Sequence, residues 1–202
     1  MTLYKNKYRI ESARLPGWDY SSPGAYFITI CTKNRKCFFG EIVNGKMDLS
    51  EMGEIANQYW IEIPDHFDNI CLDKFVIMPN HIHGILFIND KKNGRIDRPH
   101  SRRDAINRVS TIGNTNDTNH TNGGATGYYN PMIHQNISKI IRWYKGRTSF
   151  EIRKNNPEFV WQSRFHDHVI RDENELNRIR QYIVNNPEQW EKDNNYVAEG
   201  KS

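Results

Sequence analysis

Two histidines alternate in the segment Met78-Pro79-Asn80-His81-Ile82-His83-Gly84, the sharpest chemical feature of the sequence. Residues two apart on a strand project to the same face of a sheet, about 6.6 Å apart along the chain, so His81 and His83 can share one metal ion. An H-x-H pattern alone is also typical of structural histidines, and a metal site needs a third ligand. Ile85 stands where a nucleotide hydrolase would carry a third histidine, and the helical H-E-x-x-H geometry of zinc peptidases is missing.

A second pair, Tyr182 and Asn186, lies near the end of a segment with helical periodicity. Residues four apart share one face of a helix, so these two side chains are neighbours. In a functional interpretation Tyr182 is a nucleophile and Asn186 an oxygen ligand beside it. The alternative is an amphipathic helix with a tyrosine at the boundary of the core.

Periodicity and turn signals predict the elements that position these residues. In chain order they are a strand at 25–32, a hairpin of 37–43 and 46–49 around Asn44-Gly45, a helix from a Ser50 cap to Pro64, strands at 71–78 and 81–88, a helix from Asn130-Pro131 to Gly146, a strand at 159–171, and a helix from an Asp172 cap to Pro187. This order favours an α+β fold of ferredoxin-like type, a sandwich with a mostly antiparallel sheet and helices packed on one face.

Periodicity vanishes between Lys91 and Gly127, where Asn, Thr, Gly and Arg dominate. We expect 91–127 to be a long, flexible, disordered insertion within a single domain that spans residues 1–202. The three cysteines form no C-x-x-C pair and the first twenty residues are polar and basic, which predicts a cytoplasmic protein with free thiols. No apolar run approaches the roughly 20 residues that span a bilayer, so no membrane partner is expected.

The net charge of +4 hides a strong asymmetry. Residues 1–14, 91–108 and 139–154 carry +3, +5 and +5, which leaves −9 on the rest of the chain. Basic segments of this kind suit a polyanion such as nucleic acid, because neutralised phosphates release counterions. Solvated basic faces are the alternative, and charge alone does not decide between the two.

Several motifs in order carry a resemblance to a known family. The histidine segment resembles the HUH signature (His, bulky hydrophobe, His) of single-tyrosine transposases. The run 161–171, followed by Tyr182-Ile183 and Asn186-Pro187, resembles the REP-associated tyrosine transposases of the insertion-sequence-200-like superfamily. Two N-terminal stretches, 14–20 and 23–29, are similar to the same region of that family. Linked motifs in order are far more specific than H-x-H alone.

The resemblance implies a nuclease core that binds single-stranded DNA with a palindromic hairpin and cuts it by transesterification through a covalent 5′-phosphotyrosine. His81 and His83 then become metal ligands, Tyr182 the nucleophile and Asn186 the third ligand. Two imidazoles and an amide oxygen suit manganese or zinc by ligand softness, whereas the family implies magnesium or manganese as the divalent metal. The acceptor of the phenolic proton stays open: His166 and His168 are candidates only by chemistry, and a structural role is favoured for both.

Phosphate contacts are expected from one predicted helix, because a helix fixes the direction of its basic side chains; these residues are Lys139, Arg142, Lys145 and Arg147. Trp143, Tyr144 and Tyr128-Tyr129 can stack on unpaired bases or pack in the core. A monomer and a homodimer are both compatible with the sequence. The main alternative function is a domesticated DNA- or RNA-binding module of the same fold without cleavage. A phosphodiesterase that uses water is a third.

Overall fold

The computed structural model of the chain describes residues 3–4, 7–8, 17–90 and 136–196. The elements are β1 (Leu3–Tyr4), β2 (Lys7–Tyr8), β3 (Gly24–Cys31), η1 (Lys33–Arg35), β4 (Gly40–Val43), β5 (Lys46–Leu49), α1 (Glu51–Ile61), α2 (Ile63–His66), β6 (Ile70–Met78), β7 (His81–Ile88), α3 (Ile137–Ile152), β8 (His166–Ile170), α4 (Glu173–Asn185) and η3 (Pro187–Lys192). The expected insertion at 91–127 lies outside the described residues.

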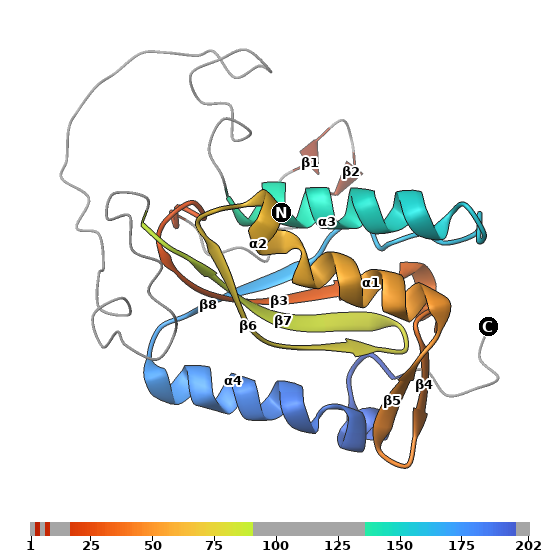
Figure 1. Cartoon of the computed structure of the whole chain (residues 1–202). Coiled ribbons are helices and arrows are strands. Elements are labelled where there is room, and N and C mark those ends of the chain that lie inside the picture. Colours follow the sequence, from red (N-terminus) through yellow and green to blue (C-terminus); the bar gives the residue numbers. More distant parts are fainter. Residues whose placement is uncertain (1–2, 5–6, 9–16, 91–135, 197–202) are drawn as a thin grey trace, which may run out of the picture.

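Four strands form the central sheet in the order β6-β7-β3-β8, and each neighbouring pair is antiparallel. The elements β3, α1, β6, β7, α3 and β8 follow one another as β-α-β-β-α-β, the connection of a ferredoxin-like fold. The predicted α+β class with a mostly antiparallel sheet is therefore confirmed. The hairpin of β4 and β5 is inserted between β3 and α1 (Figure 1).

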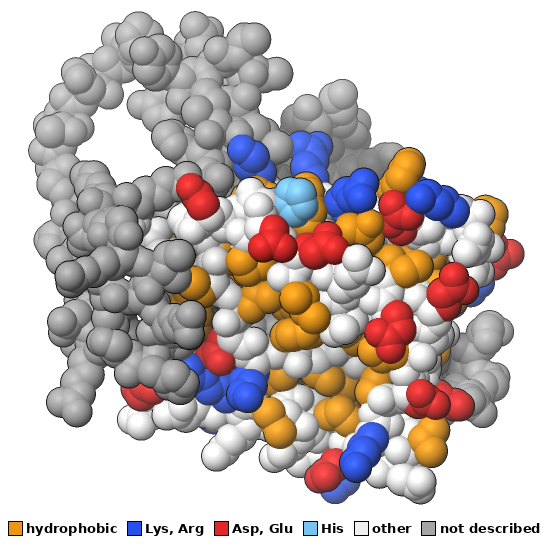
Figure 2. Space-filling model, in the orientation of Figure 1, with side chains coloured by type: hydrophobic (Ala, Val, Ile, Leu, Met, Phe, Trp, Pro, Cys, Tyr) orange, Lys and Arg blue, Asp and Glu red, His pale blue; other side chains and the backbone are white. Residues whose placement is uncertain are grey.

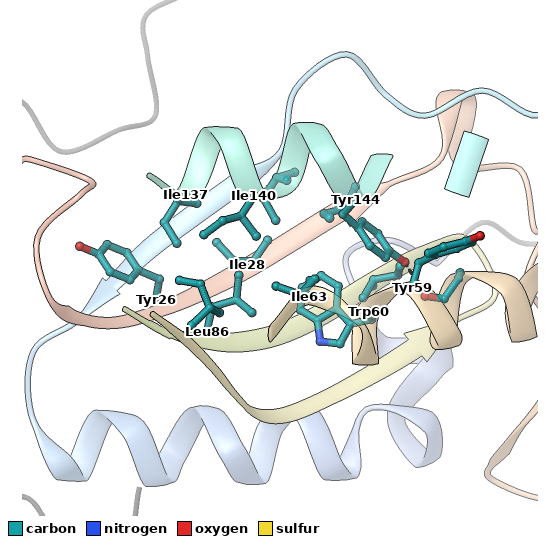
Figure 3. Packing of buried hydrophobic residues seen from close by; sticks show 14 of the residues in the cluster. Tyr26, Ile28, Tyr59, Trp60, Ile63, Leu86, Ile137, Ile140 and Tyr144 are labelled. Atoms are coloured by element: carbon teal, nitrogen blue, oxygen red, sulfur yellow. Dashed lines mark hydrogen bonds between the residues drawn. The ribbon is translucent and has the colours of Figure 1, made fainter. Parts of the chain in front are cut away.

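The main core lies between the sheet and the two helices α1 and α3 (Figure 3). Tyr26, Ile28 and Leu86 of the sheet point toward Ile140 of α3 and Trp60 of α1 in this view, and all five side chains are buried. Because strand side chains alternate between faces, the even-numbered residues of β7 supply this core.

Helix α4 packs on the opposite face of the sheet, below it in Figure 1. Its buried side chains Leu176 and Ile183 contact a small apolar cluster that includes Ala25, Ile85 and Ile170. The prediction that the helices pack on one face therefore holds for α1 and α3 and is wrong for α4. The apolar stripe of α4 shows that this helix is buried on one side, but a stripe carries no information about which face of the sheet it meets.

Local sequence signals place most of the turns and helix starts. Asn44 and Gly45 both have positive φ, 52° and 72°, as a two-residue type I′ hairpin turn requires. The Ser50 hydroxyl accepts a hydrogen bond from the Gly53 amide at 3.1 Å, and Asp172 caps α4 by accepting from the Glu175 amide at 2.8 Å. These predicted caps are confirmed.

Two helix ends differ from their predictions. Helix α3 continues through Gly146 to Ile152, because Thr148 and Ile152 keep its buried face in the core and outweigh the cost of one glycine, about 1 kcal/mol. Helix α1 ends at Ile61, and Pro64 lies in the first turn of α2. The predicted start of α3 at Asn130-Pro131 lies outside the described residues; the described helix is capped by Asn136.

The last predicted strand, 159–171, is shorter in the structure. Only His166–Ile170 pairs with β3, and Trp161 forms an isolated bridge with Thr32. Phe159 and Trp161 instead pack against each other in the core, with ring centroids 5.1 Å apart. Alternating apolar residues therefore mark burial here without a continuous ladder of hydrogen bonds.

Charge is unevenly distributed on the face shown in Figure 2. Lys and Arg side chains gather along the edge of that face at the top of the view, where α3 lies. None of the described helices combines the length and the apolar character needed to cross a membrane.

Candidate active site

His81 and His83 lie on the face of β7 that is turned away from the main core. Ile82 between them packs into that core, so the period of two directs both imidazoles to the α4 side. The two rings lie 4.4 Å apart between centroids, and the residues are 0% and 3% exposed. The predicted pair of histidines therefore shares one buried position next to α4.

Helix α4 brings the predicted nucleophile to this position. The Tyr182 hydroxyl lies 3.1 Å from His83 Nε2, although the two residues are 99 positions apart in sequence. Tyr182 is 43% exposed, so a substrate can reach its ring from solvent. Asn186, at the end of the same helix, is 2% exposed and lies on the same side. The structure thus brings together all four residues that the sequence places in the catalytic and metal site.

Asp193 is a site residue that the sequence reasoning did not identify. Its Oδ2 accepts hydrogen bonds from the Tyr182 hydroxyl at 2.9 Å and from Asn186 Nδ2 at 3.0 Å. The same oxygen lies 3.9 Å from His83 Nε2, and the carboxylate side chain is only 2% exposed. The sequence carries no clear signal for it, because Glu188 and Glu191 lie as close to Tyr182 in sequence and only the turn after η3 selects Asp193.

Burial decides the protonation of both histidines. It lowers the pKa of His81 from 6.5 to about 2, with a further contribution from His83. Burial also lowers the pKa of His83, against the opposing effect of Asp193. Both imidazoles are therefore neutral at pH 7 and have a lone pair available for a ligand.

Asp193 and Tyr182 are shifted in opposite directions. Burial opposes ionisation of Asp193, but contacts with His83, Asn186 and the Asn195 amide outweigh it and hold the pKa of the carboxyl below its usual value. Burial and the Asp193 charge raise the pKa of the Tyr182 phenol. Within the described ranges Asp193 makes an ion-pair contact with His83 alone, so its buried negative charge is not neutralised by a lysine or an arginine.

These residues fit a divalent cation. Ligand atoms of His81, His83 and Asp193 all lie within 4.8 Å of one another. His81 Nε2 and Asn186 Oδ1 are buried and have no hydrogen-bond partner among the described residues. Buried acceptor atoms without partners cost free energy, and a cation bound between them and the Asp193 carboxylate would remove that cost. Two imidazole nitrogens and two oxygens form a mixed donor set that suits manganese or zinc by ligand softness.

The basic side chains predicted to contact phosphate lie elsewhere. The predicted phosphate binders are on α3, across the sheet from the histidines (Figure 1); they are Lys139, Arg142, Lys145 and Arg147. Arg147 stacks on the Tyr59 ring and donates to its hydroxyl at 3.0 Å, and Lys145 donates to the Gln162 carbonyl. The structure does not bring these cations to the histidine site, and their contact with DNA stays a prediction.

The structure also places the aromatic residues and the two histidines for which the sequence left more than one role open. Tyr144 is buried and donates to the Ala56 carbonyl at 2.8 Å, and Trp143 packs against His66, so the core interpretation of both is supported. His168 contacts Glu175 Oε1 at 2.9 Å beside the start of α4, which is a structural position. His166 pairs with Thr29 in the sheet and is exposed. Tyr128-Tyr129 lies outside the described residues.

The fold and the site together define a ferredoxin-like protein with a candidate metal position beside a tyrosine. Residues 129–186 match the family model described as "Transposase IS200 like". The chain is 38% identical over 188 residues to an uncharacterized protein of Haemophilus influenzae (strain ATCC 51907 / DSM 11121 / KW20 / Rd), covering 93% of each protein. Residues 129–186 therefore match the IS200-like transposase family, and the resemblance seen in the sequence is confirmed.

Two solved structures are similar to the chain at low identity. A REP-associated tyrosine transposase bound to a REP hairpin is 17% identical, with a TM-score of 0.47 and coverage of 93% of this chain and 73% of that one. A putative transposase from Deinococcus radiodurans is 15% identical, with a TM-score of 0.36 and coverage of 85% and 95%.

Proposed function

We propose that the protein is a metal-dependent single-stranded DNA endonuclease and strand transferase that acts through a covalent 5′-phosphotyrosine at hairpin DNA. The observation that carries the proposal is the meeting of Tyr182 with His83, Asn186 and Asp193 on the α4 face of the sheet. A phenol beside two neutral imidazoles and a buried carboxylate suits a nucleophile next to a metal position. The match of residues 129–186 to the IS200-like transposase model supports the same chemistry.

His81, His83 and Asp193 would hold the divalent ion, magnesium or manganese, with Asn186 as a further ligand through Oδ1. When bound, the ion supplies charge neutralisation and polarisation at the scissile phosphate. Asn186 can offer Oδ1 while its Nδ2 donates to Asp193, because that oxygen has no hydrogen-bond partner among the described residues.

In the proposed reaction Tyr182 is the nucleophile and Asp193 accepts its proton. The Tyr182 oxygen attacks phosphorus, the O–P bond of the phosphotyrosine forms, and the bond from phosphorus to the 3′ oxygen breaks. The phenolic proton has an acceptor in Asp193 Oδ2 at 2.9 Å, and the departing 3′ oxygen takes a proton from solvent. The Asp193 charge also raises the pKa of Tyr182, so neutralising that charge makes the phenol more acidic. Because the phosphotyrosine ester stores the energy of the broken bond, the 3′ hydroxyl can reverse the step.

The test is covalent trapping. Incubating the protein with single-stranded hairpin DNA and MnCl2 should yield a protein–DNA adduct that survives denaturing electrophoresis. Tyr182→Phe should abolish the adduct, while Tyr196→Phe, a second exposed tyrosine fourteen residues further on, should retain it. An adduct that persists in Tyr182→Phe would contradict the assignment, and cleavage without an adduct would identify a phosphodiesterase that uses water.

A binding module without cleavage is the second candidate. The basic side chains of α3 favour it, because they lie on the other side of the sheet from the histidines and need no metal. Salt-sensitive hairpin binding that is unchanged by EDTA, with every strand left intact, would support this function over the first.

A further inference from the structure

Asn80 occupies the turn between β6 and β7, directly before the first histidine, and is 0% exposed. Its side-chain nitrogen Nδ2 donates to two backbone carbonyls, that of Arg35 at 3.0 Å and that of Asn195 at 2.9 Å. Its side-chain oxygen Oδ1 lies 2.8 Å from His81 Nδ1. The carboxamide therefore makes three hydrogen bonds to three separate segments of the chain.

The hydrogen-bond partners of Asn80 allow only one orientation of its carboxamide. Carbonyl oxygens only accept hydrogen bonds, so the nitrogen of Asn80 must face Arg35 and Asn195, and the oxygen must face His81. That oxygen can only accept, so the proton of the neutral imidazole lies on Nδ1. The lone pair is then on Nε2, the atom that is buried without a partner among the described residues.

The backbone of Asn80 is held as firmly as its side chain. Its carbonyl accepts from the amide of Thr32 at 2.9 Å and from the Thr32 hydroxyl at 3.0 Å. Arg35, whose carbonyl is one of the two acceptors, has a φ of 56°, a left-handed conformation that is unfavourable for residues other than glycine. Several contacts thus hold an unfavourable backbone where it can orient the carboxamide.

His83 offers a useful contrast within the same strand. Its Nδ1 contacts the Thr29 hydroxyl at 2.9 Å, and a hydroxyl can donate or accept. The Thr29 contact therefore does not determine the tautomer of His83, whereas the Asn80 contact determines that of His81.

We propose that Asn80 is a positioning residue that fixes His81 as the Nδ1-protonated tautomer, with its Nε2 lone pair directed at the cluster of His83 and Asp193. The tautomer follows from the hydrogen bonds alone. Its use in metal binding rests on the proposed function. Partners of this kind fix the orientation of metal-bound imidazoles, and their loss lowers metal affinity by about 10- to 100-fold.

The first test reads the tautomer in metal-free protein by ¹⁵N-detected correlation spectra of the histidine rings, with the His81 signals assigned from their loss in His81→Gln. Wild-type protein should show a protonated Nδ1 and an unprotonated Nε2 at His81. A protonated Nε2 in wild type would overturn the inference, whatever any variant does. In Asn80→Ala the Nδ1-protonated form should lose its dominance, and an unchanged spectrum there would also overturn it.

The second test is calorimetric titration with MnCl2. Asn80→Ala should bind manganese about 10- to 100-fold more weakly than wild type, while Asn89→Ala, at the other end of β7, should bind it unchanged. If wild type binds no manganese but shows the expected tautomer, the proposed function fails and the role of Asn80 stands. If Asn80→Ala does not fold, the wild-type spectrum decides alone, because a protonated Nε2 at His81 there would overturn the inference.

Discussion

The two faces of the central sheet differ in what they bury. Toward α1 and α3 the sheet presents a large, continuous apolar and aromatic cluster around Trp60 and Tyr144. Toward α4 it presents a small apolar cluster next to buried polar groups: His81, His83, Asn186 and the Asp193 side chain. Burial of apolar surface stabilises a fold, whereas buried polar atoms without partners cost free energy. The first face thus supplies most of the buried apolar surface, and the second holds His81 Nε2 and Asn186 Oδ1 without partners among the described residues.

The largest expected effect comes from a cavity created in the main core, which should change stability without changing the histidine site on the other face. Trp60 is 0% exposed, and Trp60→Ala should lower the free energy of unfolding by about 3–5 kcal/mol in urea titrations. Among molecules that remain folded, the affinity for manganese should be unchanged, because the histidines lie across the sheet. A variant with normal stability or with a selective loss of manganese binding would contradict the separation.

The second prediction changes the α4 face of the sheet, by the substitution Asp193→Asn. Asp193 accepts hydrogen bonds from Tyr182, Asn186 and the Asn195 amide, and these contacts stabilise its ionised form in the folded state. The substitution should therefore lower the metal-free free energy of unfolding, and calorimetric manganese binding should be lost. Glu188→Gln, a carboxylate of η3 that is not in the cluster, serves as the matched control and should bind as wild type does. Retained binding in Asp193→Asn would remove this carboxylate from the metal site.

The pH dependence of stability should come from the α4 face. His81 takes up a proton near pH 6.5 when unfolded but only near pH 2 when folded, so the unfolded state binds more protons between these values. Stability is therefore lost as the pH falls below 6.5, by up to about 1.4 kcal/mol per pH unit from this group. Urea titrations at pH 7 and pH 5 should show a smaller loss in His81→Gln than in wild type; equal losses would mean that His81 is not buried as a neutral group.

The smallest effect concerns the contact that holds α4 in place. A β-bulge between Leu72 and Phe75 turns Asp73 of β6 toward α4, where its Oδ2 accepts from Arg180 Nε at 2.7 Å. Arg180→Ala should lower the free energy of unfolding by about 1 kcal/mol and speed hydrogen exchange in α4. Arg178→Ala on the same helix, which removes an exposed ion pair with Glu175, should change neither. Equal exchange in both variants would show that Asp73 does not hold the helix.

Sequence patterns predict turns and helix caps, which depend on neighbouring residues. They fail for features that are decided by packing between distant segments. The Asn44-Gly45 turn and the Ser50 and Asp172 caps follow from the chemistry of a few adjacent residues. The end of α3 was predicted wrongly at Gly146, since the buried side chains beyond it outweigh a local preference.

For the site, the positions of His81, His83, Tyr182 and Asn186 were accessible because each pair is set by the period of one strand or one helix. Asp193 was not, because it enters through the irregular turn after η3. The sequence also does not predict which face of the sheet α4 covers. The pattern of Leu176, Ile179 and Ile183 indicates only that one side of the helix is buried.

The alternation along β7 has a consequence for how this protein can change over time. Ile82 and Leu86 face the main core and His81 and His83 face α4, so one strand serves both sides of the sheet residue by residue. A shift of one residue in this strand would put imidazoles into the hydrocarbon interior and isoleucines at the tyrosine. Substitutions can alter one side at a time, but an odd-numbered insertion or deletion in β7 removes stability and the site together. Variation in length is thereby confined to segments outside this strand.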